Sequence, residues 1–199
     1  MPGDPVTRLR LATPAGERVH GADALLLALG GGSWAKLGSD GAWVPWLVER
    51  GVAVAPLAPS NCGFDVGWSA YFAQRHAGTP LKNVRLGFTD AQGHRFDRLG
   101  ECVLTATGVE GSLVYAASAL LREQIAAAGL ARIELDLVAH RSEAELARAL
   151  AAGRGSRSLP NHLRERAGLH GATLALLRER WSADELQAAA AQPAVLARE

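Results

Sequence analysis

Residues 24–35 read ALLLALGGGSWA, and expectations for the N-terminal third of the chain start from this run. Its first six residues form the longest strongly apolar stretch and show no polar alternation, which is typical of a strand covered on both faces. A buried strand is therefore expected over residues 24–29. Three glycines end the run, and glycine lets a backbone approach a ligand closely.

These glycines fit the pattern G-x-G-x-x-A of dinucleotide-binding turns, in which a pyrophosphate lies at a helix N-terminus. The match is incomplete, because Gly38 and Gly41 interrupt the helix that should follow directly. An acidic residue closing a second strand about twenty residues later is also missing. Three interpretations stay open: a flexible loop leaving a sheet, a phosphate-binding turn, or a loop that contacts a nucleotide without being its main phosphate-binding turn.

A short helix is expected over residues 41–50, directly after the glycine-rich stretch. Ser39 or Asp40 can cap it by accepting backbone N–H bonds, and Gly51 can end it in a left-handed turn. The start of this helix either serves the helix alone or points toward an anionic or polarised ligand atom.

The remaining pattern is that of an α+β protein. Alternation around Pro14-Ala15-Gly16 predicts an N-terminal hairpin. Residues 60–82 are expected to be irregular, and Gly108 and Gly111 to bracket a loop. Residues 52–57 are expected to form an edge strand or a crossover. Further strands are expected at residues 83–89, 94–97, 101–105 and 132–137. Helices are expected at residues 112–128, 143–152, 159–167, 171–181 and 183–191.

Composition excludes several classes of protein. The chain has 199 residues, 48% apolar and 21% charged, as in ordinary globular proteins. Its net charge of +1 gives no electrostatic footprint for nucleic acid, and no apolar run approaches a membrane span. The first residues show no signal peptide. With Cys62 and Cys102 expected to be reduced thiols, these features predict a cytoplasmic protein.

No constellation of side chains indicates a catalytic or metal site. Residues 67–71 resemble a nucleophile elbow around Ser69 but lack its final glycine. The six histidines show no metal-ligand spacing, and no P-loop occurs. Arg154 and Arg157 either grip a phosphate or form a solvated basic loop. The tryptophans of residues 34–68 either stack on an aromatic ligand or belong to the core.

Five short motifs stand in order along the chain: Leu29-Gly30-Gly31-Gly32-Ser33-Trp34, Lys36-Leu37-Gly38-Ser39-Asp40-Gly41, Pro56-Leu57-Ala58-Pro59, Thr107-Gly108-Val109-Glu110-Gly111-Ser112 and Leu135-Asp136-Leu137. This series resembles the BaiN-like NAD(P)/FAD-dependent oxidoreductases, bacterial flavoproteins that include aminoacetone-oxidase-like enzymes. The resemblance implies an oxidoreductase that binds FAD, uses NAD(P)H and acts on a small-molecule substrate.

The resemblance also implies three regions. Residues 1–51 would be part of a Rossmann-like FAD-binding domain, residues 52–138 a β-rich, barrel-like inserted domain, and residues 139–199 a helical subdomain. Glycine N–H groups would contact the cofactor, and Asp40 would start the helix behind it. The residues that would lie beside FAD are Gly30, Gly31, Gly32, Ser33, Asp40 and Gly41.

The chain departs from that family at both ends. The G-x-G-x-x-G turn that holds the FAD pyrophosphate and the closing G-E-x-x-D and G-G-Y-N-type segments are absent. We therefore expect an internal piece of a flavoprotein, inactive by itself, in which residues 24–29 lack strand partners. The alternative is a non-enzymatic binding module whose β-rich and helical parts present a surface to a partner.

Overall fold

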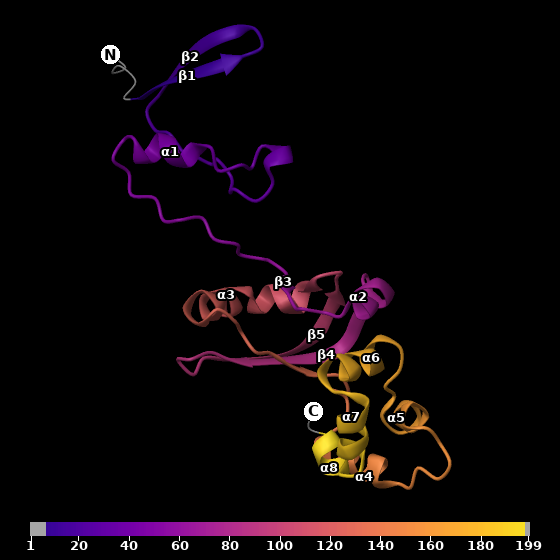
Figure 1. The fold of residues 1–199 in the computed structure, drawn as a ribbon. Coiled ribbons are helices and arrows are strands. Elements are labelled where there is room, and N and C mark those ends of the chain that lie inside the picture. Colours follow the sequence, from indigo (N-terminus) through magenta and orange to yellow (C-terminus); the bar gives the residue numbers. More distant parts are fainter. Residues whose placement is uncertain (1–6, 198–199) are drawn as a thin grey trace. The chain divides into compact units, whose positions relative to one another are not determined.

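The chain divides into two units, Met1–Ala58 and Pro59–Glu199. A computed structural model describes residues 7–197, and its elements are labelled in Figure 1.

The first unit begins with the expected hairpin. Strands β1 (Thr7–Thr13) and β2 (Gly16–Ala22) pair antiparallel, with Thr13 opposite Gly16. The Thr13 hydroxyl donates to the carbonyl of Gly16 at 2.7 Å, and Gly16 takes a φ of +104° that favours glycine. The prediction from Pro14-Ala15-Gly16 is confirmed.

The prediction of a buried strand over residues 24–29 is wrong. The segment has no strand partner, and Leu25, Leu26 and Leu27 are 42%, 89% and 48% exposed. Within the described chain, no backbone N–H from residue 23 to residue 33 donates a hydrogen bond. The run has the composition of a covered strand, but nothing in residues 7–58 pairs with it. Residues 52–57 form no strand, so of the two alternatives for this segment the edge strand is wrong.

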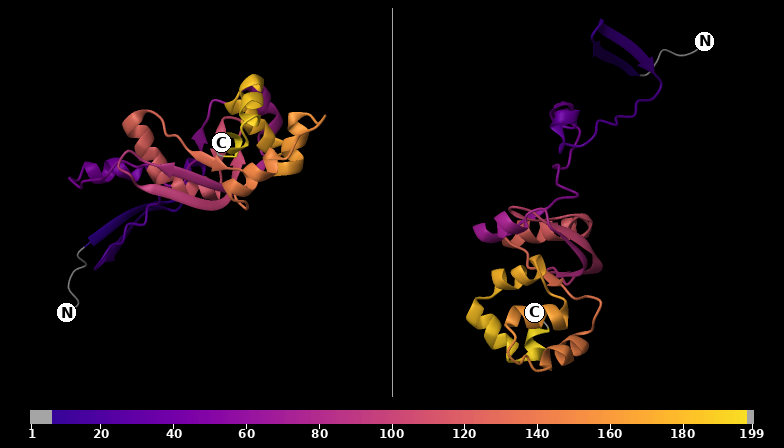
Figure 2. Two further views of the ribbon diagram at one scale, coloured as in Figure 1. Left: turned by 90° about the horizontal axis from the view of Figure 1, so that it is seen from below. Right: turned by 90° about the vertical axis from the view of Figure 1, so that its right-hand side faces the viewer.

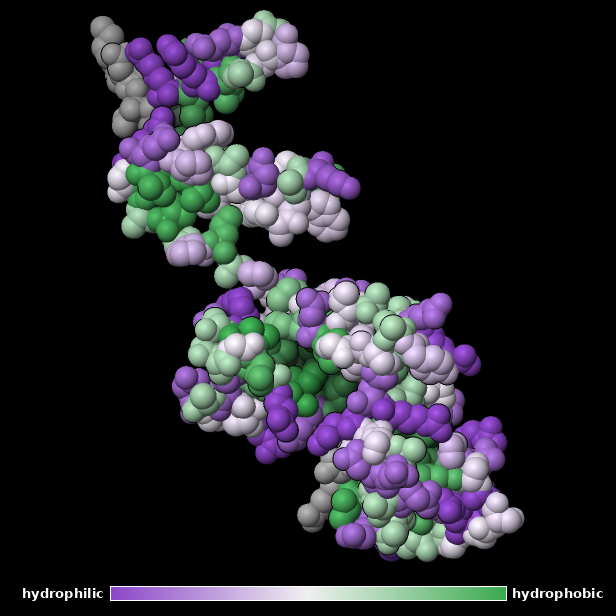
Figure 3. Space-filling view, viewed as in Figure 1, coloured by the Kyte–Doolittle hydropathy of each residue, from purple (hydrophilic) through white to green (hydrophobic). Residues whose placement is uncertain are grey.

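A 3-10 turn, η1 (Ala35–Leu37), and a short helix, α1 (Trp43–Val48), complete this unit. The helix is shorter than the expected 41–50, and its N-cap residue is Ala42. Figure 3 shows hydrophobic residues gathered around α1, where Trp46 and Val48 are 56% and 54% exposed.

A five-stranded antiparallel sheet forms one part of the second unit. Its strands lie in the order β3-β6-β5-β4-β7, so β3 and β7 are its edges and the described sheet is open rather than the expected barrel. The strands are β3 (Phe64–Asp65), β4 (Pro80–Thr89), β5 (Arg95–Leu104), β6 (Gly108–Glu110) and β7 (Glu134–Asp136).

Three expectations in this region need correction. Residues 94–97 and 101–105 were expected as separate strands, but β5 is continuous because residues 98–101 also pair with β4. Residues 60–82 are not irregular throughout, since they contain β3, helix α2 (Ala70–His76) and the start of β4. The expected loop at Gly108 begins with β6.

Helix α3 (Ser112–Ala128) has the expected bounds and lies along one face of the sheet (Figures 1 and 2). From Val84 to Phe88, alternate residues of β4 are buried, and a register shift between Lys82 and Val84 lets Leu81 face the same side. These residues share one core with α3. The buried members from these two elements are Leu81, Val84, Leu86, Phe88, Leu113, Val114, Ala117 and Leu121.

The C-terminal part is a cluster of short helices, coloured orange to yellow in Figure 2. The four expected helices are confirmed to within about one residue, and α8 was not expected. Leu163 is fully buried in the second core that these helices enclose. The helices are α4 (Glu143–Ala151), α5 (Leu159–Ala167), α6 (Ala172–Arg180), α7 (Ala183–Ala190) and α8 (Pro193–Leu196).

Contacts between α2 and α6 join the sheet to this helical part. Ser69, the N-cap of α2, donates its backbone N–H and its hydroxyl to the carboxylate of Glu179 at 2.8 and 2.7 Å. Ala172 of α6 is buried in the same core as the sheet. None of the helices in residues 7–197 combines the length and the apolarity that crossing a membrane requires.

Candidate functional site

The residues predicted to lie beside a cofactor form one folded loop in Met1–Ala58. The Gly41 N–H donates to the Gly31 carbonyl at 3.1 Å. Between them, Trp34 and Ser39 form an antiparallel bridge, with N–H to O distances of 2.8 and 3.1 Å. These bonds close the loop on itself and bring its two glycine-containing ends together.

The end of the Leu57 side chain lies close to two glycines of this loop. A Cβ added to Gly32 would lie 2.8 Å from Leu57 Cδ1, and one added to Gly41 would lie 3.1 Å from it. Gly41 also has a φ of +72°. A side chain at either position would therefore shift the end of the Leu57 side chain, and at Gly41 it would also strain the backbone.

Two side chains attach the loop to α1. Trp43 donates its indole N–H to the Gly30 carbonyl at 3.1 Å. Asp40 Oδ1 accepts the N–H of Ala42 at 3.0 Å, so Asp40 stabilises the turn that leads into the helix. Sequence reasoning missed the roles of Trp43 and Leu57, because contacts between distant residues leave no local pattern.

The groups of this loop that could bind a ligand belong to its backbone. The N–H groups of Gly31, Gly32 and Ser33 donate to no acceptor within residues 7–197, and all three residues are exposed. Successive free N–H groups can bind an anionic or polarised oxygen. Helix α1 has only six residues, so any such binding rests on the loop.

Other residues that the sequence singled out have structural roles. Ser69 caps α2 by accepting the Phe72 N–H at 3.1 Å, which explains the incomplete nucleophile elbow. Arg157 pairs with Glu165 at 2.9 Å, and Arg154 donates to Gln187 at 3.1 Å. Both arginines are thus engaged by protein groups instead of being available to grip a phosphate.

The tryptophans form no common ligand site in the described chain. Trp68 is half-buried and donates to the Gly108 carbonyl at 3.2 Å, whereas Trp34 is 64% exposed. Within residues 7–197, no group of three or more potential ligands could hold a metal ion. Cys62 and Cys102 are free thiols, and burial raises the pKa of Cys102 to about 11.

One protein-family model matches most of the second unit. The family model described as the HI0933-like protein barrel and H2TH domain matches residues 58–197. The chain belongs to the HI0933-like family. This family is associated with FAD-dependent oxidoreductase-like proteins. No curated protein is significantly similar to the chain.

The HI0933-like match begins where the second unit begins. It includes the five-stranded sheet, α3 and the helical part, and it leaves the glycine loop outside. The flavoprotein association therefore rests on the sheet and helices, whereas the loop is a candidate site on its own geometry and on its resemblance to a flavoprotein motif.

Proposed function

We propose that this HI0933-like chain is part of an FAD-dependent oxidoreductase and that residues 30–41 contact the cofactor. The observation that carries the proposal is the family match over residues 58–197. A link to NAD(P)H, a small-molecule substrate and a cytoplasmic location are part of the same proposal, and they follow from the resemblance to BaiN-like enzymes and from the composition.

The glycine loop fits a polar cofactor. Gly31, Gly32 and Ser33 present N–H groups that the described protein does not use, and a flavin nucleotide carries carbonyl and phosphate oxygens that accept such bonds. Asp40 and Trp43 hold the loop in place through the Ala42 N–H and the Gly30 carbonyl. FAD would supply hydride and electron transfer when bound, and these residues would bind and orient it.

The exposed run before the loop agrees with this proposal. Leu26 is 89% exposed and Leu27 48%, although their type favours burial. In a flavin-binding domain, residues 24–29 would pair within a sheet and cover these side chains. The same exposure favours the second candidate function, a non-enzymatic module that docks this run on a protein partner.

Titration of the full chain with FAD tests the proposal and separates the two candidates. The proposal predicts saturable quenching of flavin fluorescence and a rise in melting temperature, because a ligand that binds only the folded state stabilises it. A folded chain that binds no flavin contradicts FAD binding by residues 30–41 in this chain alone, and it leaves the docking module as the candidate function of the isolated chain.

A matched pair of variants locates the binding. Gly31→Val is the informative change, because the nearest atom to an added Cβ is Ser39 Oγ at 3.8 Å and no positive φ is required. The fold of the loop should survive while the new side chain crowds its N–H groups. Gly153→Val, in open space in the helical part, is the control. We expect Gly31→Val alone to weaken FAD binding, by about ten-fold for one or two lost hydrogen bonds.

A further inference from the structure

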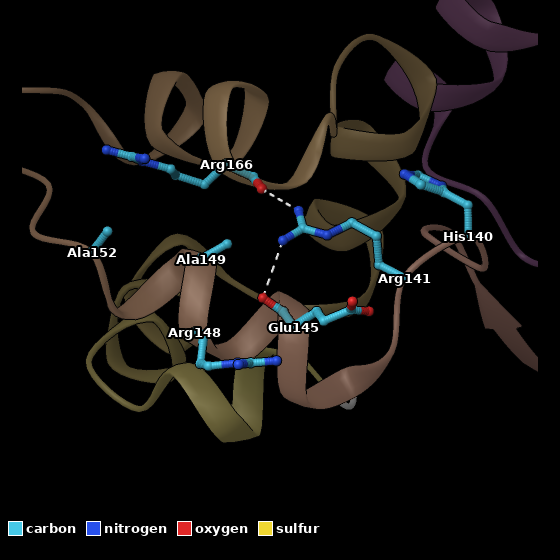
Figure 4. Close-up of a pocket in the computed structure, with 7 residues that line it drawn as sticks. All are labelled: His140, Arg141, Glu145, Arg148, Ala149, Ala152 and Arg166. Carbon is cyan, nitrogen blue, oxygen red and sulfur yellow. Dashed lines mark hydrogen bonds between the residues drawn. The ribbon is translucent and has the colours of Figure 1, made fainter.

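Two hollows mark the surface of the helical part. In the first, between α4 and α5, Arg141 donates to the carbonyls of Arg166 and Glu145 at 2.5 and 3.1 Å and so joins the two helices. Figure 4 shows the side chains of Arg148 and Arg166 pointing away from each other, so they do not converge on one ligand. The first hollow is therefore a structural joint, and the second hollow is the candidate site.

The second hollow lies where α5, α6 and α7 meet, and its volume of about 520 Å³ is in the range of small-molecule sites. Its floor is the helical core, to which Leu163 and Leu186 belong with 0% and 5% of their surface exposed. Leu174 and Trp181 are only partly buried against this core, so its edge is incompletely covered here. The large apolar residues that line the second hollow are Leu159, Pro160, Leu163, Leu174, Trp181 and Leu186.

One positive charge lies at the second hollow without a partner. Arg178 stands on α6 four residues after Leu174 and three before Trp181, a spacing that places the three side chains on one face. Among residues 7–197, the Arg178 guanidinium forms no ion pair or hydrogen bond, and no acidic residue lines the second hollow. A guanidinium beside apolar surface favours a ligand that carries both a negative charge and an apolar body.

The acidic residues near Arg178 in the sequence do not neutralise it. Glu179 binds the start of α2, and Glu185 accepts the Ser182 N–H at 2.9 Å in the capping box of α7. Asp184 is exposed and does not line the second hollow. The charge of Arg178 is therefore left for an anionic group from outside residues 7–197.

Two further polar groups at the second hollow are also donors. The indole N–H of Trp181 donates to no acceptor in the described part of the chain. Gln187 Oε1 accepts from Arg154 at 3.1 Å, which leaves the amide NH₂ of Gln187 to donate. A carboxylate accepts hydrogen bonds from such donors, and it can take two parallel bonds from one guanidinium.

We propose that the second hollow binds a small monocarboxylate with an apolar body, such as a fatty acid. Its carboxylate pairs with Arg178, and its chain lies on Leu174 and Trp181. A monocarboxylate fits better than a phosphate ester, because a single unpaired guanidinium balances a single charge. The second hollow is separate from the glycine loop, and this inference does not rest on the proposed function.

Isothermal titration calorimetry of the full chain with octanoate tests the proposal, with octanol and acetate as matched ligands. Octanoate should bind saturably, whereas octanol lacks the charge and acetate lacks the chain, so each should bind at least about ten-fold more weakly. From butanoate to octanoate, each added CH₂ should tighten binding by about two- to four-fold. The indole N–H signal of Trp181, assigned with Trp181→Phe, should shift in an NMR titration with octanoate.

Arg178→Gln separates the charged part of the site from the apolar part. It should weaken the binding of octanoate by about ten-fold and leave the binding of octanol unchanged. Arg178 is exposed and contacts no polar group of the described chain, so the variant should fold, which circular dichroism checks. Arg180→Gln is the matched control, since Arg180 lies on the same helix, is exposed and does not line the second hollow.

Three outcomes would overturn the proposal. One is the absence of saturable octanoate binding up to about 10 mM, which corresponds to almost no affinity. Another is an equal loss of binding in Arg178→Gln and Arg180→Gln, or a Trp181 signal that does not move, because the ligand would then bind elsewhere. The third is binding of an acidic amphipathic helical peptide without binding of octanoate, which would replace the small molecule by a protein partner.

Discussion

Ser118 offers the sharpest test of how the second unit is held together. Its side chain is fully buried on α3. The hydroxyl accepts the Cys62 N–H at 3.2 Å and lies 3.1 Å from the Cys62 carbonyl and 3.2 Å from the Val114 carbonyl, both acceptors for its proton. It thereby fastens the segment that precedes β3 to the middle of α3.

Ser118→Ala removes these bonds and leaves the Cys62 N–H without its partner. The Cys62 N–H is part-buried, so leaving it unsatisfied costs up to about 1–3 kcal/mol, whereas the small loss of volume adds little. For a unit of this size, we expect the melting temperature to fall by about 3–10 °C. Cys62 should also react faster with a thiol reagent, because its backbone is no longer fixed.

Thermal unfolding followed by circular dichroism measures the first effect, and the rate of iodoacetamide labelling measures the second. Ser112→Ala is the control: Ser112 begins the same helix, is exposed, and makes one long hydrogen bond of 3.5 Å to the Glu101 carbonyl. The reasoning fails if both variants melt within about 1 °C of the parent chain, a change too small for an unsatisfied buried donor.

Three further outcomes are expected. Leu163→Ala, at a fully buried position of the helical core, should lower the free energy of unfolding in urea by about 2–5 kcal/mol. Burial raises the pKa of Cys102 to about 11 from 9.0, so iodoacetamide at pH 8 should label Cys62 first. The stability that the protonated Cys102 thiol contributes to the fold should be complete below pH 9.0 and should fall as pH rises toward 11. The hydrogen bond from the Ser142 side chain lowers the pKa of Glu145 below 4.5, so its stabilisation should be present above pH 4.5 and decline in acid. Ser142→Ala should raise the pKa of Glu145 part of the way back toward 4.5 in an NMR titration, because the backbone N–H of residue 142 still donates to the carboxylate, and it should reduce amide protection in α4.

Local signals explain what the sequence predicted well. The bounds of α3 follow from an apolar stripe and from Gly129, which ends the helix with a φ of +79°. The starts of α4 and α7 follow from capping boxes at Ser142 and Ser182, and both boxes are present in the structure. Each of these signals lies within a few residues of the element that it defines.

Features that depend on distant partners were missed. The apolar run at residues 24–29 has a strand's composition, but pairing needs a neighbouring strand that residues 7–58 do not provide. Helix α2 was missed although its cap is local: Ser69 accepts the Phe72 N–H, and the bonds from Ser69 to Glu179 of α6 hold that cap in place. Arg141 and the carbonyl of Arg166 are 25 residues apart in sequence and come together only when α5 packs on α4.

The bond between Ser69 and Glu179 limits how the second unit can be divided. Because α6 supplies the carboxylate that α2 uses, and Ala172 belongs to the core of the sheet, a protein shortened before α4 would expose both the start of α2 and part of that core. Recombination between relatives should therefore exchange the sheet and the helices as one block. Swapping either part alone would join a helix start to a surface that did not evolve with it.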